Sequence, residues 1–312
     1  MQMEETLRGR RLATGCGLAA ILLWSIAVAL TRSLSEQLGP VTAGASVYGV
    51  SGLLALARLW WSDEERRQLR RLPRAYLVVC SGLFLGYMLL LLFAVGLAAN
   101  RQQVREGGLL NYLWPPLTLL LAVVLLGKTA RLTLAPATLL ALAGLFLVLI
   151  PNGRVSWASL VTNLARNPVA YTLGFAAAVA WALYSVLTRK WAGGQRTGAV
   201  KVFLPATAVA FLFIGCFVDE PRAWSMRTGV EVVVFGTATF LAYGLWDIAM
   251  REGNMVVVAS ASYLTPLLST VVSCLYLAVT PQPRFWVGCG LLIVGSVASG
   301  YSISETKHPN RG

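Results

Sequence analysis

The sequence has little charge for its length. Only 12% of its 312 residues are Asp, Glu, Lys or Arg, whereas 57% are hydrophobic. A soluble domain carries charge on about a quarter of its residues. Stretches such as Ala75–Asn100 and Asn167–Thr188 contain no charged residue, and each is long enough to cross a hydrocarbon layer of about 30 Å as a helix. Because a soluble fold has no place for so many helices without a polar face, the composition excludes a water-soluble protein.

Histidine is almost absent, and the cysteines are not paired in the sequence. The only histidine is His308, near the C-terminal end, and the five cysteines show no Cys-x-x-Cys spacing. No cluster of Asp, Glu, His or Cys has the spacing of a metal site or of a nucleophile with its base. We therefore expect no enzyme activity, no metal and no cofactor.

The basic residues do not follow the pattern of a nucleic-acid-binding protein, although the net charge is +13. Arg and Lys occur in short runs between apolar stretches rather than along one amphipathic face. In a membrane protein such runs set the orientation. We expect a lipid bilayer as the surroundings and no nucleic acid as a partner.

The apolar stretches predict an all-α integral membrane protein with ten transmembrane helices. A Thr280–Pro283 cluster with two prolines predicts a turn between the last two of them. Trp60 and Trp61 stand at the end of the second span, as expected of anchors at the membrane surface. The predicted spans are Leu12–Leu34, Val41–Trp61, Ala75–Ala98, Gln103–Leu126, Leu132–Ile150, Pro168–Trp191, Val200–Val218, Gly229–Met250, Met255–Val279 and Arg284–Ser302.

The distribution of basic residues predicts the orientation. With ten spans, the side that holds both termini carries 18 Lys and Arg residues and the other side carries 8. Cytoplasmic loops carry the excess of Lys and Arg. Both termini are therefore expected in the cytoplasm, in a multi-pass protein of a bacterial inner membrane.

The two halves of the chain, residues 1–151 and 152–312, resemble each other in register. The matching segments are Trp24 with Trp181, Phe84–Tyr87 with Phe240–Tyr243, Tyr112–Pro115 with Tyr263–Pro266, and Gly144 with Gly295. Each half holds five predicted spans, an odd number, so the second half enters the bilayer upside down relative to the first. Inverted repeats of this kind are the architecture of alternating-access transporters.

Several motifs resemble those of one transporter family. They are Trp24-Ser25, Leu38–Pro40, Tyr48–Leu54, the block Asn111–Pro115 and Ser262–Pro266. With ten spans in a five-plus-five arrangement, the chain resembles the drug/metabolite transporter (DMT/EamA) superfamily, and within it the exporters of aromatic amino acids. The resemblance covers nearly the whole chain and implies efflux of Phe, Tyr, Trp and other neutral amino acids. The segment Arg105–Gly108 departs from the apolar entry expected for the fourth span.

Helix breakers and aromatic residues inside spans indicate where a substrate binds. Pro115 and Pro266 occupy matching places in the fourth and ninth spans, where freed carbonyls survive only beside a cavity; simple packing kinks are the alternative. Aromatic side chains at depth need a partner for their polar atoms, which a cavity supplies, although helix packing would also bury them. The predicted lining is Trp24, Ser25, Tyr48, Ser51, Tyr87, Asn111, Tyr112, Trp114, Trp181, Tyr184, Tyr243, Trp246 and Tyr263.

Asp247 is the only acid placed clearly within a span. An intramembrane carboxylate suggests a coupling site or a gate, but this one is close enough to its helix end to pair with Arg251, one turn further on. No Arg or Lys lies deep in a span, which argues against phosphate-ester substrates.

The sequence thus predicts an exporter of neutral, chiefly aromatic, amino acids with alternating access through an aromatic-lined cavity. The alternatives are a multidrug exporter of lipophilic cations, which would use Asp247, and a membrane scaffold or sensor without flux. A monomer suffices for this architecture, and the sequence does not set the oligomeric state.

Overall fold

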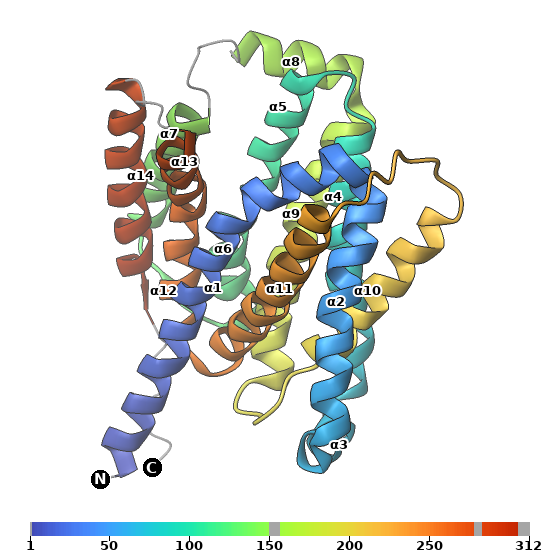
Figure 1. The fold of residues 1–312 in the computed structure, drawn as a ribbon. Helices are drawn as coiled ribbons and strands as arrows, with labels where there is room; N and C mark the ends of the chain where they lie inside the picture. The colour runs from blue at the N-terminus through green and yellow to red at the C-terminus, as the bar shows by residue number, and fades with distance from the viewer. Residues whose placement is uncertain (1, 150–156, 278–282, 305–312) are drawn as a thin grey trace. The chain divides into compact units, whose positions relative to one another are not determined.

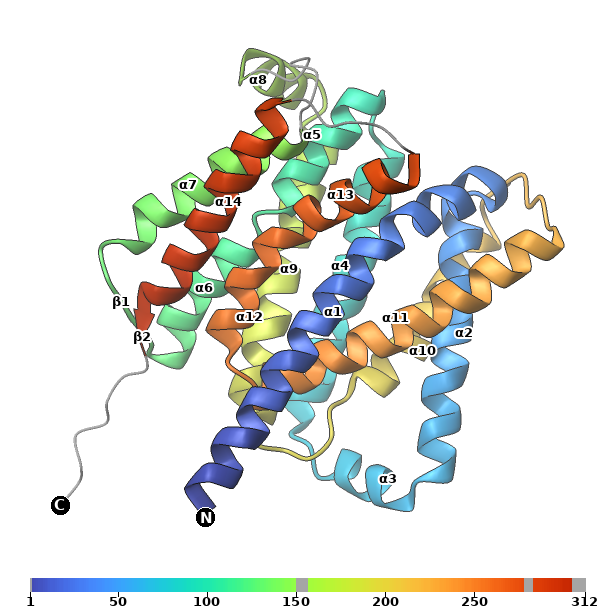
Figure 2. The ribbon, with the colours of Figure 1, turned by 60° about the vertical axis from the view of Figure 1, so that its left-hand side comes forward.

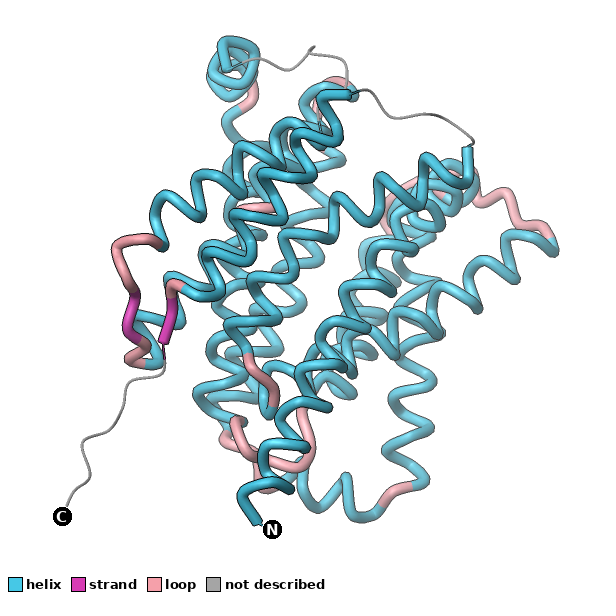
Figure 3. Tube along the Cα trace, turned by 90° about the vertical axis from the view of Figure 1, so that its left-hand side faces the viewer, coloured by secondary structure: helices cyan, strands magenta, loops and turns pink. Residues whose placement is uncertain are grey.

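The computed structural model describes residues 2–149, 157–277 and 283–304. Helices make up nearly all of this part of the chain (Figure 3). Contacts divide the chain into two compact units, and each draws on both halves of the sequence. The predicted turn at Thr280–Pro283, except for Pro283 itself, and the ends of two spans, Ile150 and Val279, lie outside the described residues.

Unit 1 comprises residues 1–92 and 187–254. Its elements are α1 (Gln2–Leu38), α2 (Pro40–Trp61), α3 (Asp63–Arg70), the π-helix η1 (Tyr76–Cys80), most of α4 (Ser81–Gly96), the end of α9 (Pro168–Ala192), α10 (Val200–Gly215) and α11 (Met226–Glu252). In this unit α1 packs along α11, and α2 packs along α10 (Figure 2). The close approach of α2 to α10 needs Gly52, because a side chain there would collide with the backbone of Pro205.

Glu220 fixes the start of α2. Gly39 adopts a positive φ of 84°, which glycine tolerates best, and Pro40 follows at the first helical position. The carboxylate of Glu220 accepts hydrogen bonds from the backbone N–H groups of Val41 (2.9 Å) and Thr42 (2.6 Å). Two donors that the helix itself leaves unpaired are thereby satisfied.

Unit 2 comprises residues 93–186 and 255–312. Its described elements are α5 (Arg101–Asn111), α6 (Trp114–Leu126), β1 (Thr129–Ala130), α7 (Leu134–Leu149), α8 (Trp157–Arg166), most of α9, α12 (Met255–Ala261), the 3-10 helix η2 (Ser262–Leu264), α13 (Thr265–Leu277), α14 (Pro283–Tyr301) and β2 (Ile303–Ser304). Helices α7 and α14 run side by side (Figure 1). The strands β1 and β2 pair antiparallel, a two-stranded addition to a fold predicted as all-α.

Glycine allows α7 and α14 to approach closely. A side chain at Gly144 would overlap the backbone of Leu292 and lie 2.6 Å from the carbonyl oxygen of Gly288. A side chain at Gly295 would overlap the backbone of Ala141. Small residues at such crossings let two helix backbones pack directly against each other.

Six helical segments in the described part of the chain are long and apolar enough to cross a membrane. A seventh is counted if the two parts of α1, Leu7–Ser25 and Leu30–Leu38, form one span bent by 44°. Three shorter apolar helices are Leu134–Leu149, Val200–Gly215 and Met255–Val271. The helical fold predicted from the composition is therefore confirmed, with several helices long and apolar enough to cross a membrane.

Candidate functional site

Aromatic rings predicted as cavity lining form a cluster in unit 1. The ring of Trp24 lies 5.5 Å from that of Tyr243 and 5.1 Å from that of Trp246, measured between centroids. Tyr48 stacks on Tyr243 at 6.5 Å. Tyr87 is partly buried on α4 of the same unit. Helices α1, α2 and α11 thus bring together rings that are far apart in the sequence.

The polar atoms around this cluster largely bond within unit 1. The Tyr48 hydroxyl lies 2.8 Å from the sulfur of Met88 and 3.4 Å from the Tyr243 hydroxyl. Ser25 donates to the carbonyl one turn earlier in its own helix (2.8 Å), and Ser51 donates to that of Tyr48 (3.2 Å). Such bonds back to the same helix are common for serine in membranes, so a substrate contact for either hydroxyl remains a prediction.

Two apolar helical segments of unit 2 are interrupted next to the prolines singled out in the sequence. The first is interrupted between Asn111, the last residue of α5, and Trp114, the first of α6. The second passes through η2, which contains Tyr263 and ends one residue before α13. Pro115 and Pro266 occupy the second positions of α6 and α13. The two interruptions therefore stand at matching places of the sequence repeat.

The break between α5 and α6 places a buried acceptor, the side chain of Asn111, close before two prolines. Pro115 and Pro116 have no N–H, so neither can donate a backbone hydrogen bond within the helix. Asn111 is 9% exposed, and its side-chain oxygen has no hydrogen-bond partner among the described residues. Buried acceptors without a partner are costly. The side-chain oxygen of Asn111 can therefore accept a hydrogen bond from a cationic or polar ligand.

A second aromatic group lies in unit 2. Trp114, at the start of α6, meets the Trp181 ring edge-to-face at 6.2 Å, and Trp181 contacts Tyr184 at 5.1 Å. All three side chains are at most 5% exposed. Tyr263, 1% exposed, packs in the apolar core formed around α7 and α14. Trp114 thus places this aromatic group directly after the α5–α6 break.

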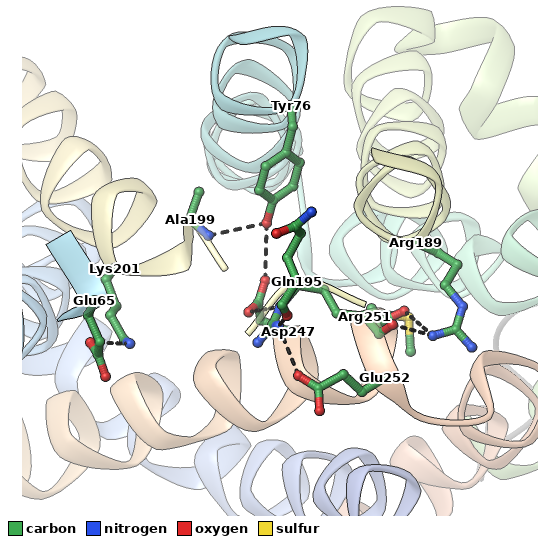
Figure 4. A network of polar contacts seen from close by, with 10 residues as sticks. Glu65, Tyr76, Arg189, Gln195, Ala199, Lys201, Asp247, Arg251 and Glu252 are labelled. Carbon is green, nitrogen blue, oxygen red and sulfur yellow. Dashed lines mark hydrogen bonds and ion pairs between the residues drawn. The ribbon is translucent and has the colours of Figure 1, made fainter. Parts of the chain in front are cut away.

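Asp247 sits in a polar network in unit 1 (Figure 4). Its carboxylate pairs with Arg251 Nε at 2.9 Å and accepts a hydrogen bond of 3.2 Å from the hydroxyl of Tyr76. The same hydroxyl accepts a hydrogen bond of 3.2 Å from the backbone N–H of Ala199. Both charged side chains are 3% exposed. The sequence offered pairing with Arg251 as the alternative to a transport role for Asp247. This ion pair is present, and it is buried rather than open to water.

The chain around this pair is held by further contacts (Figure 4). Arg251 donates to the carbonyl of Gln195, and Arg189 donates to the carbonyls of Met250, Arg251 and Gly253, the last at 2.6 Å. These bonds join the end of α9, the following loop and the end of α11. Because its oxygens are already engaged, Asp247 is poorly suited to bind a lipophilic cation.

Glu106 is a buried acid whose surroundings the sequence analysis missed. It lies in α5 and is 0% exposed. Its carboxylate accepts hydrogen bonds from Gln102 (3.0 Å), from Ser159 (3.0 Å) and Asn163 (3.0 Å) on α8, and from the hydroxyl of Tyr171 on α9. All four donors are uncharged. The carboxylate thus ties three helices of unit 2 together.

Replacing Glu106 with Gln is expected to destabilise the protein by about 2 kcal/mol, because hydrogen bonds to a charged acceptor are worth about 1.5–3 kcal/mol each and some donors lose their partner. Thermal unfolding of the purified protein in detergent measures the change. Glu64→Gln is the control, since exposed Glu64 has one such bond, of 2.6 Å, to Gln68. Equal melting temperatures for the two variants would contradict the structural role of Glu106.

The described residues contain no group of three or more His, Cys, Asp or Glu side chains placed to hold a metal ion.

Comparisons with known proteins identify the family. The model of the EamA-like transporter family matches residues 12–150 and 168–301. The chain is 37% identical over 287 residues to the aromatic amino acid exporter YddG of Salmonella typhimurium, covering 91% of this chain and 95% of that protein. It is 34% identical over 290 residues to the protein of the same name from Escherichia coli, covering 92% and 96%.

A further relative and a solved structure agree. The aromatic amino acid exporter YddG of Ancylobacter novellus is 29% identical, covering 93% of this chain and 97% of that protein. One crystal structure superposes with a TM-score of 0.79 at 27% identity, covering 93% of this chain and 98% of the other. The predicted transporter family is confirmed, and with it the prediction that the chain is no enzyme. This multi-pass membrane protein belongs to the EamA-like transporter family.

Proposed function

We propose that the protein exports aromatic and other neutral amino acids across the bacterial inner membrane by alternating access. The observation that carries this proposal is the near full-length similarity to two proteins named as aromatic amino acid exporters, at 37% and 34% identity. Transported amino acids are zwitterions, so a binding site must accommodate an ammonium, a carboxylate and, for the preferred substrates, an aromatic ring.

The architecture that we propose has ten spans. The six long apolar helical segments, the bent α1 and the three shorter apolar helices correspond in order to the ten predicted segments. With ten spans and the observed excess of basic residues on one side, both termini lie in the cytoplasm. Labelling of tags at the two ends tests this: tags reached from opposite sides of the membrane would contradict it.

The spans are proposed to form an inverted repeat, residues 1–151 and 152–312. The family model matches once within each of these halves. The contact of α7 with α14 is also reciprocal. Gly144 faces Gly288 and Leu292, and Gly295 faces Ala137 and Ala141. The sequence offset between Gly144 and Gly295 is 151 residues. The same offset relates Ala137 to Gly288 and Ala141 to Leu292. The two helices therefore contact each other through equivalent positions, as a local two-fold axis requires.

The aromatic cluster of unit 2 and the break near Asn111 are proposed to recognise the substrate, and the aromatic cluster of unit 1 is proposed separately as cavity lining. Aromatic faces stack on an aromatic side chain and attract an ammonium group. The side-chain oxygen of Asn111 is an acceptor for the same ammonium. Such an acceptor favours a ligand that carries an ammonium group over a carboxylic acid of the same shape that lacks one.

Flux of labelled phenylalanine in proteoliposomes tests the function. We expect saturable flux of phenylalanine. Unlabelled tyrosine, tryptophan and other neutral amino acids should reduce this flux by competition. The absence of saturable flux for any neutral amino acid would refute the proposal. Efflux of a lipophilic cationic dye that Asp247→Asn abolishes, without amino acid flux, would favour a multidrug exporter instead.

Asn111→Leu is expected to lower the apparent affinity for phenylalanine about tenfold, because it removes an acceptor for the ammonium, a loss of about 1.4 kcal/mol. Competition by 3-phenylpropionate, which lacks the ammonium, should change little. Thr237→Leu is a control of similar size change, since Thr237 is half-buried on α11 and its hydroxyl bonds back to the carbonyl of Val233 in its own helix. If the variant lost affinity for phenylalanine and for 3-phenylpropionate to the same extent, Asn111 would not recognise the ammonium group.

A further inference from the structure

Short helix α3 follows the end of α2 and is anchored firmly in unit 1. Ser62 caps it by accepting from the backbone N–H of Glu65 at 3.3 Å. The carboxylate of Glu65 pairs with Lys201, at the start of α10, and with Arg58 on α2 at 3.0 Å. Leu72, just after α3, is only 4% exposed. Helix α3 therefore has a fixed position in unit 1.

The acids of α3 are used within the unit. Asp63 pairs with Arg66, which also donates to the carbonyl of Trp60 at 2.9 Å. Glu64 accepts from Gln68 at 2.6 Å, and Glu65 is engaged as described above. All three acids of this segment thus have a positive or polar partner already, and they cannot neutralise the remaining basic residues.

Four arginines of this segment are left over. Arg67, Arg70 and Arg71 are spaced by three and four residues, which places them on one face of α3. Arg74 lies two residues before η1. All four are exposed, and the ion pairs of the described residues do not include them. We call these four the arginine face.

The arginine face adjoins apolar side chains suited to a bilayer. Trp60 and Trp61, at the end of α2, are 77% and 81% exposed. Val78, in η1, is 71% exposed. Exposed tryptophans beside a transmembrane helix are typical of the headgroup region of a membrane. The arginines consequently lie where lipid headgroups are expected.

We propose that the arginine face, with Trp60 and Trp61, is a binding site for anionic phospholipid headgroups. Arginine binds the phosphate of such a lipid through paired N–H donors. Clusters of four to eight basic residues next to a transmembrane helix bind anionic lipid surfaces. The tryptophan rings pack against the glycerol and upper acyl region of the same lipids. A zwitterionic lipid offers the same phosphate, but its own cation is repelled by the four arginines.

Native mass spectrometry of the purified full chain, titrated with phosphatidylglycerol or phosphatidylcholine, tests the proposal. We expect binding of phosphatidylglycerol to be preferred, and to be weakened by salt because surface charges are screened. The variant with Arg67, Arg70, Arg71 and Arg74 all changed to Gln should bind phosphatidylglycerol at least about tenfold more weakly, since each arginine contributes about fivefold.

The control changes four exposed arginines elsewhere, Arg8, Arg11, Arg131 and Arg196, to Gln, with the same loss of charge. It should keep its affinity for phosphatidylglycerol within about twofold. An equal loss in both variants would show a bulk charge effect and overturn the site, as would equal wild-type affinity for the two lipids. Full competition by inorganic phosphate would overturn the assignment to a lipid. If the fourfold variant does not fold, the double variant of Arg67 and Arg70 to Gln is compared in the same way with the double variant of Arg8 and Arg11 to Gln, and equal losses would again overturn the site.

Discussion

Asp247→Ala is expected to destabilise the protein by about 3–5 kcal/mol, the usual cost of removing one partner from a buried ion pair. The substitution leaves the guanidinium of Arg251, whose side chain is 3% exposed, without its carboxylate. It also removes the acceptor of the Tyr76 hydroxyl. Thermal unfolding in detergent, or retention of monodisperse protein after heating, measures the effect.

The matched control is Glu36→Ala on α1. Glu36 pairs with Arg32 at 2.8 Å with the same spacing of four residues, but the two side chains are 64% and 74% exposed. An exposed pair contributes about 0–1 kcal/mol. If Asp247→Ala and Glu36→Ala lowered the melting temperature equally, the buried network of Figure 4 would not stabilise the fold.

Gly198→Ala probes the same network without removing a charge. A methyl group at Gly198 would overlap the carboxylate of Asp247. The carboxylate would have to turn away from Arg251 or Tyr76, so the variant should resemble Asp247→Ala in its direction of change.

The apolar spans could be predicted from sequence because their signal is local. A run of about 20 residues without charge already satisfies the length of a membrane helix. The interruptions near Pro115 and Pro266 were also visible, since proline removes a donor and disfavours helix for the residue before it. In the structure α5 ends at Asn111, a few residues before Pro115. The proline therefore predicts that the helix breaks nearby, but not the residue at which it ends.

The environment of Glu106 could not be predicted because its partners are distant in sequence. Ser159, Asn163 and Tyr171 lie 53 to 65 residues further along the chain. Glu106 therefore resembled an acid at a helix end. The unusual segment Arg105–Gly108 was the only sign that this entry to the fourth span differs. Burial of Arg251 at the end of α11 was hidden for the same reason, because it depends on the loop carbonyl of Gln195.

The reciprocal contact of α7 with α14 leads to a prediction about paired glycines. Gly144→Ala and Gly295→Ala are each expected to destabilise the protein by about 3 kcal/mol, because a side chain forced into a tightly packed contact costs about 1–3 kcal/mol and here it meets backbone rather than a movable side chain. The costs should be similar, since each added methyl overlaps a backbone nitrogen of the other helix. Thermal unfolding of the two variants measures them.

Gly290→Ala on α14 provides the control, because nothing lies within 4 Å of the methyl it would add. It should be neutral or stabilise the helix by about 0.5–1 kcal/mol. The double variant of Gly144 and Gly295 should cost less than the sum of the two, since one separation of the helices relieves both overlaps and sites in contact do not add. Strictly additive costs, or a large cost at only one of the two glycines, would contradict a reciprocal contact. The proposed two-fold relation between the halves would then lose its structural support in unit 2.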